Sequence, residues 1–212
     1  MLTSGALVLV FLPALAYAAC TDKDLKTVDS CYERFMVDYG FPSNDLLPAY
    51  WTFHNTRTAA IGPNLVNQVM IRKYGRQLTR CLSKHLDCVN AGLYSSRYNQ
   101  NATDAANYLS DYAITEYQSS ARGYELLMHN HECMATCGDK NGAAVDACDA
   151  AFKAAVANGG VQACNDHITC WGNVYKTCCG AEAQEYQCGV IRADDHISFP
   201  ACSSMAACPR AQ

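Results

Sequence analysis

The chain has 212 residues, of which 50% are hydrophobic and 17% are charged. Its formal net charge is −4, from 16 basic and 20 acidic residues. A weakly acidic chain without a run of basic residues disfavours nucleic acid and anionic membrane surfaces as partners.

Residues 1–18 have the features of a cleavable signal peptide. They carry no charged side chain, and an apolar run over 6–15 is followed by small residues that end at Ala18. A run this short cannot span a bilayer, which needs about 20 apolar residues, whereas a short run with a small-residue exit is typical of secretory signals. We therefore expect residues 19–212 to form a secreted, extracellular protein with no membrane span.

Three helices are predicted in the first part of the mature chain, because hydrophobic side chains recur there every three or four residues. The first begins at Thr21 or Asp22 and stops at Gly40. The second lies within 44–62, and the third runs from 63 to 88.

A polar loop over 91–103 follows, with Gly92, two serines and three asparagine or glutamine residues. It divides the mature chain into two possible sub-units, 20–92 and 104–212. The loop contains the sequence Asn-Ala-Thr, so Asn101 is a predicted N-glycosylation site.

Beyond the loop, the helical spacing continues. One helix runs from about Ile114 to Gly138, a short alanine-rich helix stops at 158–160, and another covers 164–178. The tail, 193–212, has no regular pattern. Since alternating strand patterns are scarce, the predicted fold is all-α: several helices cross-linked by about seven disulfides, with an irregular C-terminal tail.

The chain has fourteen cysteines, and all of them lie after residue 18. In an exported chain this even number predicts about seven disulfides, whereas in the cytosol it would indicate zinc. The disulfide candidates are Cys20, Cys31, Cys81, Cys88, Cys133, Cys137, Cys148, Cys164, Cys170, Cys178, Cys179, Cys188, Cys202 and Cys208.

Helix geometry limits how these cysteines pair. On one continuous helix, Cys81 and Cys88 would lie about 10 Å apart, beyond the roughly 7 Å that a disulfide spans, so they should not pair with each other. Cys133 and Cys137 lie one turn apart and should face one neighbouring element. The adjacent cysteines at 178–179 point in different directions and should bond two different partners.

The group of residues that most resembles a metal site is His129, His131, Cys133 and Cys137, because histidine and cysteine at close spacing can bind zinc or copper. On a helix, however, His129 and His131 diverge, and both cysteines are expected to be oxidised. We therefore predict no metal, no cofactor and no catalytic residue. If the protein is an enzyme, His129 and His131 are the candidates.

Other polar residues have structural interpretations. His85 and His167 lie between cysteines on apolar faces and are predicted to be core histidines. Residues 194–196, Asp-Asp-His, are predicted to form a solvated turn in the tail. Tyrosines gather between 94 and 124, where half-buried helix faces are favoured over a binding interface.

Residues 164–188 have the pattern C-x5-C-W-x6-C-C-G-A-E-A-x4-C. This pattern resembles that of secreted cysteine-rich helical domains of unknown function that are common in invertebrates, especially nematodes. The resemblance implies an extracellular helical fold and no particular activity.

The predicted function is that of a non-enzymatic extracellular binding or structural protein, with a protein or glycan as its partner. Two alternatives stay open. The chain is a toxin-like or host-directed secreted effector, or it is an extracellular carrier of a lipid or small ligand, which needs a cavity between the helices.

Overall fold

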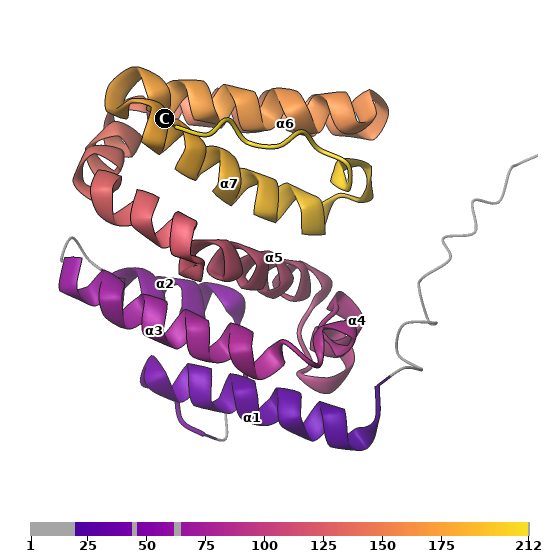
Figure 1. Ribbon diagram of the computed structural model, residues 1–212. Helices are drawn as coiled ribbons and strands as arrows, with labels where there is room; N and C mark the ends of the chain where they lie inside the picture. Colours follow the sequence, from indigo (N-terminus) through magenta and orange to yellow (C-terminus); the bar gives the residue numbers. More distant parts are fainter. Residues whose placement is uncertain (1–19, 44–45, 62–64, 212) are drawn as a thin grey trace, which may run out of the picture.

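The computed structural model describes residues 20–43, 46–61 and 65–211. The predicted signal peptide, 1–18, lies outside the described residues. The described part contains seven α-helices and no strand, which confirms the predicted all-α class (Figure 1). None of these helices combines the length and the apolar character needed to cross a membrane.

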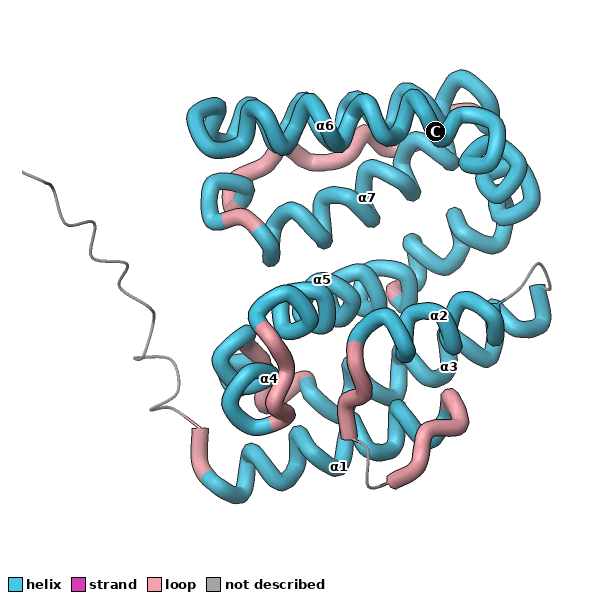
Figure 2. The backbone as a smooth tube through the Cα atoms, turned by 180° about the vertical axis from the view of Figure 1, so that it is seen from behind, coloured by secondary structure: helices cyan, strands magenta, loops and turns pink. Residues whose placement is uncertain are grey.

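The helices form a stack. α1 packs on α3, α3 on α5, α5 on α7 and α7 on α6, so that α5 lies in the middle (Figure 1 and Figure 2). In chain order the elements are α1 (Asp22–Asp38), α2 (Tyr50–Ile61), α3 (Leu65–Leu82), the short 3-10 helix η2 (Leu86–Cys88), α4 (Ala91–Arg97), α5 (Ala102–Ser119), α6 (Ala121–Cys179), α7 (Ala181–Ser198) and the 3-10 helix η3 (Pro200–Cys202).

The first helix begins and ends where the sequence predicts. Thr21 and Asp24 form a capping box, in which the Thr21 hydroxyl accepts from the Asp24 N–H at 3.2 Å and the Asp24 carboxylate accepts from the Thr21 N–H at 3.0 Å. The chain leaves the helix at Gly40, whose φ of +86° is a conformation that favours glycine. Between these ends, Val28 and Phe35 lie on the face that enters the core.

Tyrosine supplies much of the N-terminal core, which joins α1 to α5. Tyr94, Tyr108 and Tyr112 are at most 7% exposed. The Tyr108 hydroxyl donates to the Pro48 carbonyl at 2.6 Å, and the hydroxyls of Tyr32 and Tyr94 are hydrogen-bonded to each other. The clustered tyrosines therefore fill helix–helix contacts, as expected, and three of them are more deeply buried than predicted. Two further hydrophobic clusters lie between α6 and α7.

Two predicted boundaries in the N-terminal part were wrong. The helix predicted over 63–88 ends at Leu82 and is followed by a turn and η2. The predicted polar loop over 91–103 contains α4, because Asn90 caps a helix there by accepting a hydrogen bond from the Leu93 N–H at 3.0 Å.

The helix predicted from Ile114 to Gly138 belongs to two helices. Ser120 is extended, with φ −60° and ψ 164°, and its side chain caps the start of α6. α6 continues past Gly138 and breaks at Asn141 (φ −114°, ψ 17°) and at Gly160 (φ +54°, ψ −145°). The second break confirms the glycine stop predicted there.

All fourteen cysteines are paired. As predicted, Cys81 and Cys88 do not bond each other. The seven disulfides are Cys20–Cys88, Cys31–Cys81, Cys133–Cys179, Cys137–Cys178, Cys148–Cys170, Cys164–Cys202 and Cys188–Cys208.

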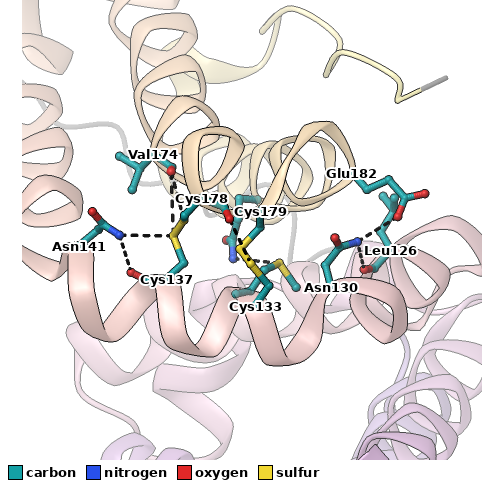
Figure 3. Close-up of a disulfide and its surroundings, with 11 residues drawn as sticks. Leu126, Asn130, Cys133, Cys137, Asn141, Val174, Cys178, Cys179 and Glu182 are labelled. Atoms are coloured by element: carbon teal, nitrogen blue, oxygen red, sulfur yellow. Dashed lines mark hydrogen bonds between the residues drawn. A yellow bond between two sulfur atoms is a disulfide. The ribbon is translucent and has the colours of Figure 1, made fainter.

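Two neighbouring disulfides hold the two ends of α6 together (Figure 3). Cys133 and Cys137 lie one turn apart near its start and bond Cys179 and Cys178 at its end, with Cα–Cα distances of 5.8 and 6.1 Å. This confirms that Cys133 and Cys137 face one neighbouring segment. No disulfide joins the first four cysteines of the chain to the last ten, all of which are described.

Candidate ligand-binding groove

A groove of about 1060 Å³ opens between α5 and α7. On α5 its wall is a stripe of side chains one helical turn apart, which includes Leu109, Ala113 and Glu116. On α7 the facing stripe includes Ala193 and Ile197. Because each stripe follows the helical repeat, two antiparallel helix faces form a continuous lining in which small and apolar side chains alternate with polar ones such as Tyr112 and His196.

Glycine sets the distance between the two helices at one end of the groove. A Cβ atom at Gly189 of α7 would overlap the ring of Tyr117 on α5. Without it, the Tyr117 ring lies directly on the α7 backbone, and its hydroxyl donates to the Glu185 carbonyl at 3.4 Å. Tyr117, Gly189 and Glu185 are themselves part of the groove lining.

An ion pair lies at the same end of the groove and holds the C-terminal segment in place. Arg122 donates from two nitrogens to the Glu185 carboxylate, at 2.7 and 2.9 Å. Glu185 also accepts from the Ala211 N–H at 2.8 Å. The Arg122 guanidinium holds the pKa of Glu185 below its ordinary value, so this carboxylate stays ionised and occupied by its partners.

Two more arginines line the groove and are exposed. Arg192 of α7 and Arg210 of the C-terminal segment form no ion pair with any described residue. Glu116 is the one other acidic side chain in the described lining. With Glu185 neutralised by Arg122, two arginines stand against the single carboxylate of Glu116, which leaves the groove with a positive edge beside its apolar side chains.

The four residues of the predicted metal-like group do not converge. His129 is exposed, with Nδ1 at 3.4 Å from Glu182, whereas His131 faces Gln68 of α3, with Nε2 at 2.9 Å from the amide nitrogen. Cys133 and Cys137 are both in disulfides. The sulfur atoms of Cys137, Cys178 and Cys179 do lie within 4.8 Å of one another, because two disulfides are adjacent there.

The predicted glycosylation site is exposed at the start of α5. The Asn101 side chain accepts a hydrogen bond from the Asp104 N–H at 2.9 Å and thereby caps the helix. Glycosylation of this residue stays a prediction.

His167 is buried, as predicted, in the contact between α6 and α7. Its Nδ1 lies 2.7 Å from Asp195 and its Nε2 lies 3.1 Å from Asp149, and its ring stacks on Phe152. The solvated turn predicted at 194–196 was wrong, because α7 continues to residue 198 and places Asp195 in the core at 2% exposure.

The charge of this cluster follows from its hydrogen bonds. Burial lowers the pKa of His167, but hydrogen bonds to Asp195 and Asp149 outweigh it and raise the net pKa above its ordinary value. His85, the other predicted core histidine, is half-buried, with Nδ1 at 3.1 Å from Asp24. We interpret both histidines as structural.

No family model, no curated protein and no solved structure matches this chain. The resemblance of residues 164–188 to nematode-type secreted domains therefore stays a prediction.

Proposed function

We propose that the protein is a secreted carrier of an amphipathic small molecule, an apolar chain with an anionic head group such as a fatty acid. The observation that supports this proposal is the groove between α5 and α7, with an apolar wall and the exposed arginines Arg192 and Arg210 at its edge. Of the predicted functions, the ligand carrier is the one for which the described residues offer a site.

The size and composition of the groove suit such a ligand. Small-molecule sites usually measure about 300–1,000 Å³ and are mostly apolar with a few charged groups. Each methylene group buried from water contributes about 0.8 kcal/mol, so an aliphatic chain supplies most of the affinity. The arginines would then select a carboxylate head and fix the direction in which the chain lies.

The disulfides favour an extracellular role for this carrier. Seven disulfides and no free thiol are typical of proteins from oxidising compartments. The bond between Cys188 of α7 and Cys208 holds the C-terminal segment beside the groove, so the lining is preformed. A preformed site avoids the entropy loss of ordering its wall when the ligand binds.

The test is displacement of a dansyl-labelled undecanoic acid from the oxidised, secreted protein. We expect the dansyl emission to rise on binding, oleate to displace the probe, and oleyl alcohol to bind at least about tenfold more weakly, which is ~1.4 kcal/mol. Replacing Ala193 by Trp should fill the groove and weaken binding of the probe by a similar factor. The matched control is Ala154→Trp, at an exposed alanine of α6 outside the groove.

Arg192→Gln combined with Arg210→Gln should remove the preference for oleate over oleyl alcohol and leave the alcohol's own affinity unchanged. If the probe does not bind, or if Ala193→Trp and Ala154→Trp behave alike, the groove is not the site of a fatty-acid-like ligand.

A further inference from the structure

A second cavity, of about 280 Å³, lies where the N-terminal helices meet the α6–α7 pair. Its lining comes from α2, α3, α5, α6 and α7, together with Tyr39 just after α1, and shares no residue with the groove. Arg57, Arg72 and His131 are the basic side chains of its described lining, and no aspartate or glutamate belongs to it. A cavity with this composition favours an anion.

The two arginines differ in what neutralises them. Arg57 is 7% exposed and donates to both oxygens of Asp111, at 2.6 and 2.7 Å. Asp111 itself lies outside the lining. Among the residues that the structure describes, no carboxylate pairs with Arg72. Its guanidinium lies over the ring of Tyr124, 3.8 Å from the centroid, so it keeps its charge and its hydrogen-bonding edge.

Two nitrogen atoms of these side chains are closed off and have no hydrogen-bond partner among the described residues: Nε of Arg72 and Nδ1 of His131. The Gln68 amide nitrogen lies 2.9 Å from His131 Nε2, so His131 is held against α3. The terminal nitrogens of Arg72 are not closed off and form no hydrogen bond with any described residue. They are therefore the donors that the cavity offers to a ligand.

One part of the remaining wall is apolar or aromatic, with Ile71, Leu127 and Met134 beside the rings of Tyr124 and Tyr186. The other part is polar and comes from Gln68, Thr115, Gln118, Ser119 and Gln187. An inorganic ion would leave the apolar part unfilled, whereas an organic anion would cover it while its carboxylate accepts from Arg72.

We propose that this cavity binds a small organic carboxylate, with a single ring or a short chain, that the terminal nitrogens of Arg72 donate hydrogen bonds to its carboxylate oxygens, and that His131 lies in the wall beside it. This site is independent of the groove. Substitutions at Arg72 should therefore leave binding of the dansyl-labelled undecanoic acid unchanged.

The experiment is calorimetric titration of the oxidised, secreted protein with benzoate, hexanoate, benzamide and inorganic phosphate. We expect benzoate or hexanoate to bind, and benzamide and phosphate to bind at least about tenfold more weakly than the better carboxylate. Arg72→Gln should weaken carboxylate binding by at least the same factor. Arg76→Gln is the matched control, because this exposed arginine lies one turn further along α3 and outside the cavity.

A measurement on the unmodified protein keeps the proposal testable if Arg72→Gln does not fold. In a proton NMR titration with the better carboxylate, the ring signals of His131 should move and those of the exposed His129 should not. The proposal is overturned if neither carboxylate binds at millimolar concentration, if benzamide or phosphate binds as well, if Arg76→Gln has the same effect as Arg72→Gln, or if the His131 signals do not move.

Discussion

Two buried ion pairs connect residues that lie far apart in the sequence. Arg57 of α2 pairs with Asp111 of α5 at 2.6 Å, and His167 of α6 pairs with Asp195 of α7 at 2.7 Å. Removing one partner of such a pair leaves a buried charge without compensation, at a cost of about 3–5 kcal/mol. These residues therefore fix which helices pack together, and both pairs are more informative about the fold than the exposed charges.

The pKa of His167 determines how stability should depend on pH. It is raised above the ordinary value of 6.5 in the folded protein. A histidine with a raised folded pKa contributes its full stability below its unfolded pKa and loses it as the pH rises through the folded pKa. We expect the free energy of unfolding, measured with guanidinium, to fall as the pH is raised above about 6.5, the ordinary histidine pKa.

His167→Gln should flatten this pH dependence and lower the free energy of unfolding at about pH 6 by roughly 3 kcal/mol, because Asp195 loses its charged partner. His129→Gln, at an exposed histidine, should keep the original slope. Since no free thiol is present, disulfide exchange does not complicate the alkaline end. Equal slopes for the unmodified protein and His167→Gln would show that His167 does not titrate in this range.

Single residues differed in how well the sequence predicted them. His167 was predicted to be buried because it lies on an apolar stripe between Cys164 and Cys170, and this was confirmed. Arg57 and Arg72 have no such signal, since an arginine on a helix is usually solvated and its burial depends on the approach of another element. The cavity residues come mostly from five helices, and local spacing carries no information about that convergence.

At the scale of elements, α6 consists of three helical segments that follow one another with no loop between them. The breaks at Asn141 and Gly160 turn the chain so that Cys133 and Cys137 meet Cys178 and Cys179. A straight helix of this length could not form these two disulfides, because the cysteines would lie more than forty residues apart along its axis.

Gly160 should tolerate substitution less well than Gly142, another glycine of α6. Its φ of +54° with ψ −145° is a conformation that only glycine adopts easily, and a Cβ there would meet no atom, so the effect of substitution is backbone strain alone. We expect Gly160→Ala to lower the free energy of unfolding by about 1–3 kcal/mol. Gly142→Ala, in the same helix and also in open space, should be neutral or stabilising by up to about 1 kcal/mol.

Chemical denaturation of both variants measures this difference. A result in which Gly142→Ala destabilises as much as Gly160→Ala would mean that the break does not depend on the glycine conformation.

The helices themselves were largely predictable, and their ends were less so. α1 was predicted correctly at both ends because Thr21 and Gly40 are standard start and stop residues. The break at Ser120 was missed, because the apolar spacing continues across it from α5 into α6. α4 was missed for the opposite reason: it is short, three of its seven residues are serine or glycine, and the cap that starts it is a single side chain, Asn90.

In the whole molecule, the disulfides form two groups, and no disulfide connects one group to the other. Two bonds involve cysteines 20–88, five involve cysteines 133–208, and α5 lies between these groups without a cysteine of its own. α5 contributes Ala105, Tyr108 and Tyr112 to the N-terminal core and packs its other face against α7. The two parts of the molecule therefore associate mainly through this helix, with a smaller direct contact between α3 and α6.

A protease site inserted after Asn99, in the connection between α4 and α5, should separate the molecule covalently but not physically. No disulfide crosses this point, so the cut protein should run as two bands on a non-reducing denaturing gel. In gel filtration without denaturant it should elute as one species, because the buried residues of α5 stay in the N-terminal core. The control is the same site between the exposed residues Ser203 and Ser204.

That control cut lies between Cys202 and Cys208, which bond Cys164 and Cys188, respectively. No disulfide links the released segment to Cys202, but the Cys188–Cys208 bond keeps it attached, so the control should give a single band until reductant is added. A single non-reduced band after the cut at Asn99 would show that a disulfide crosses between the two groups. Separation of its fragments in gel filtration would show instead that α5 does not hold the two parts together.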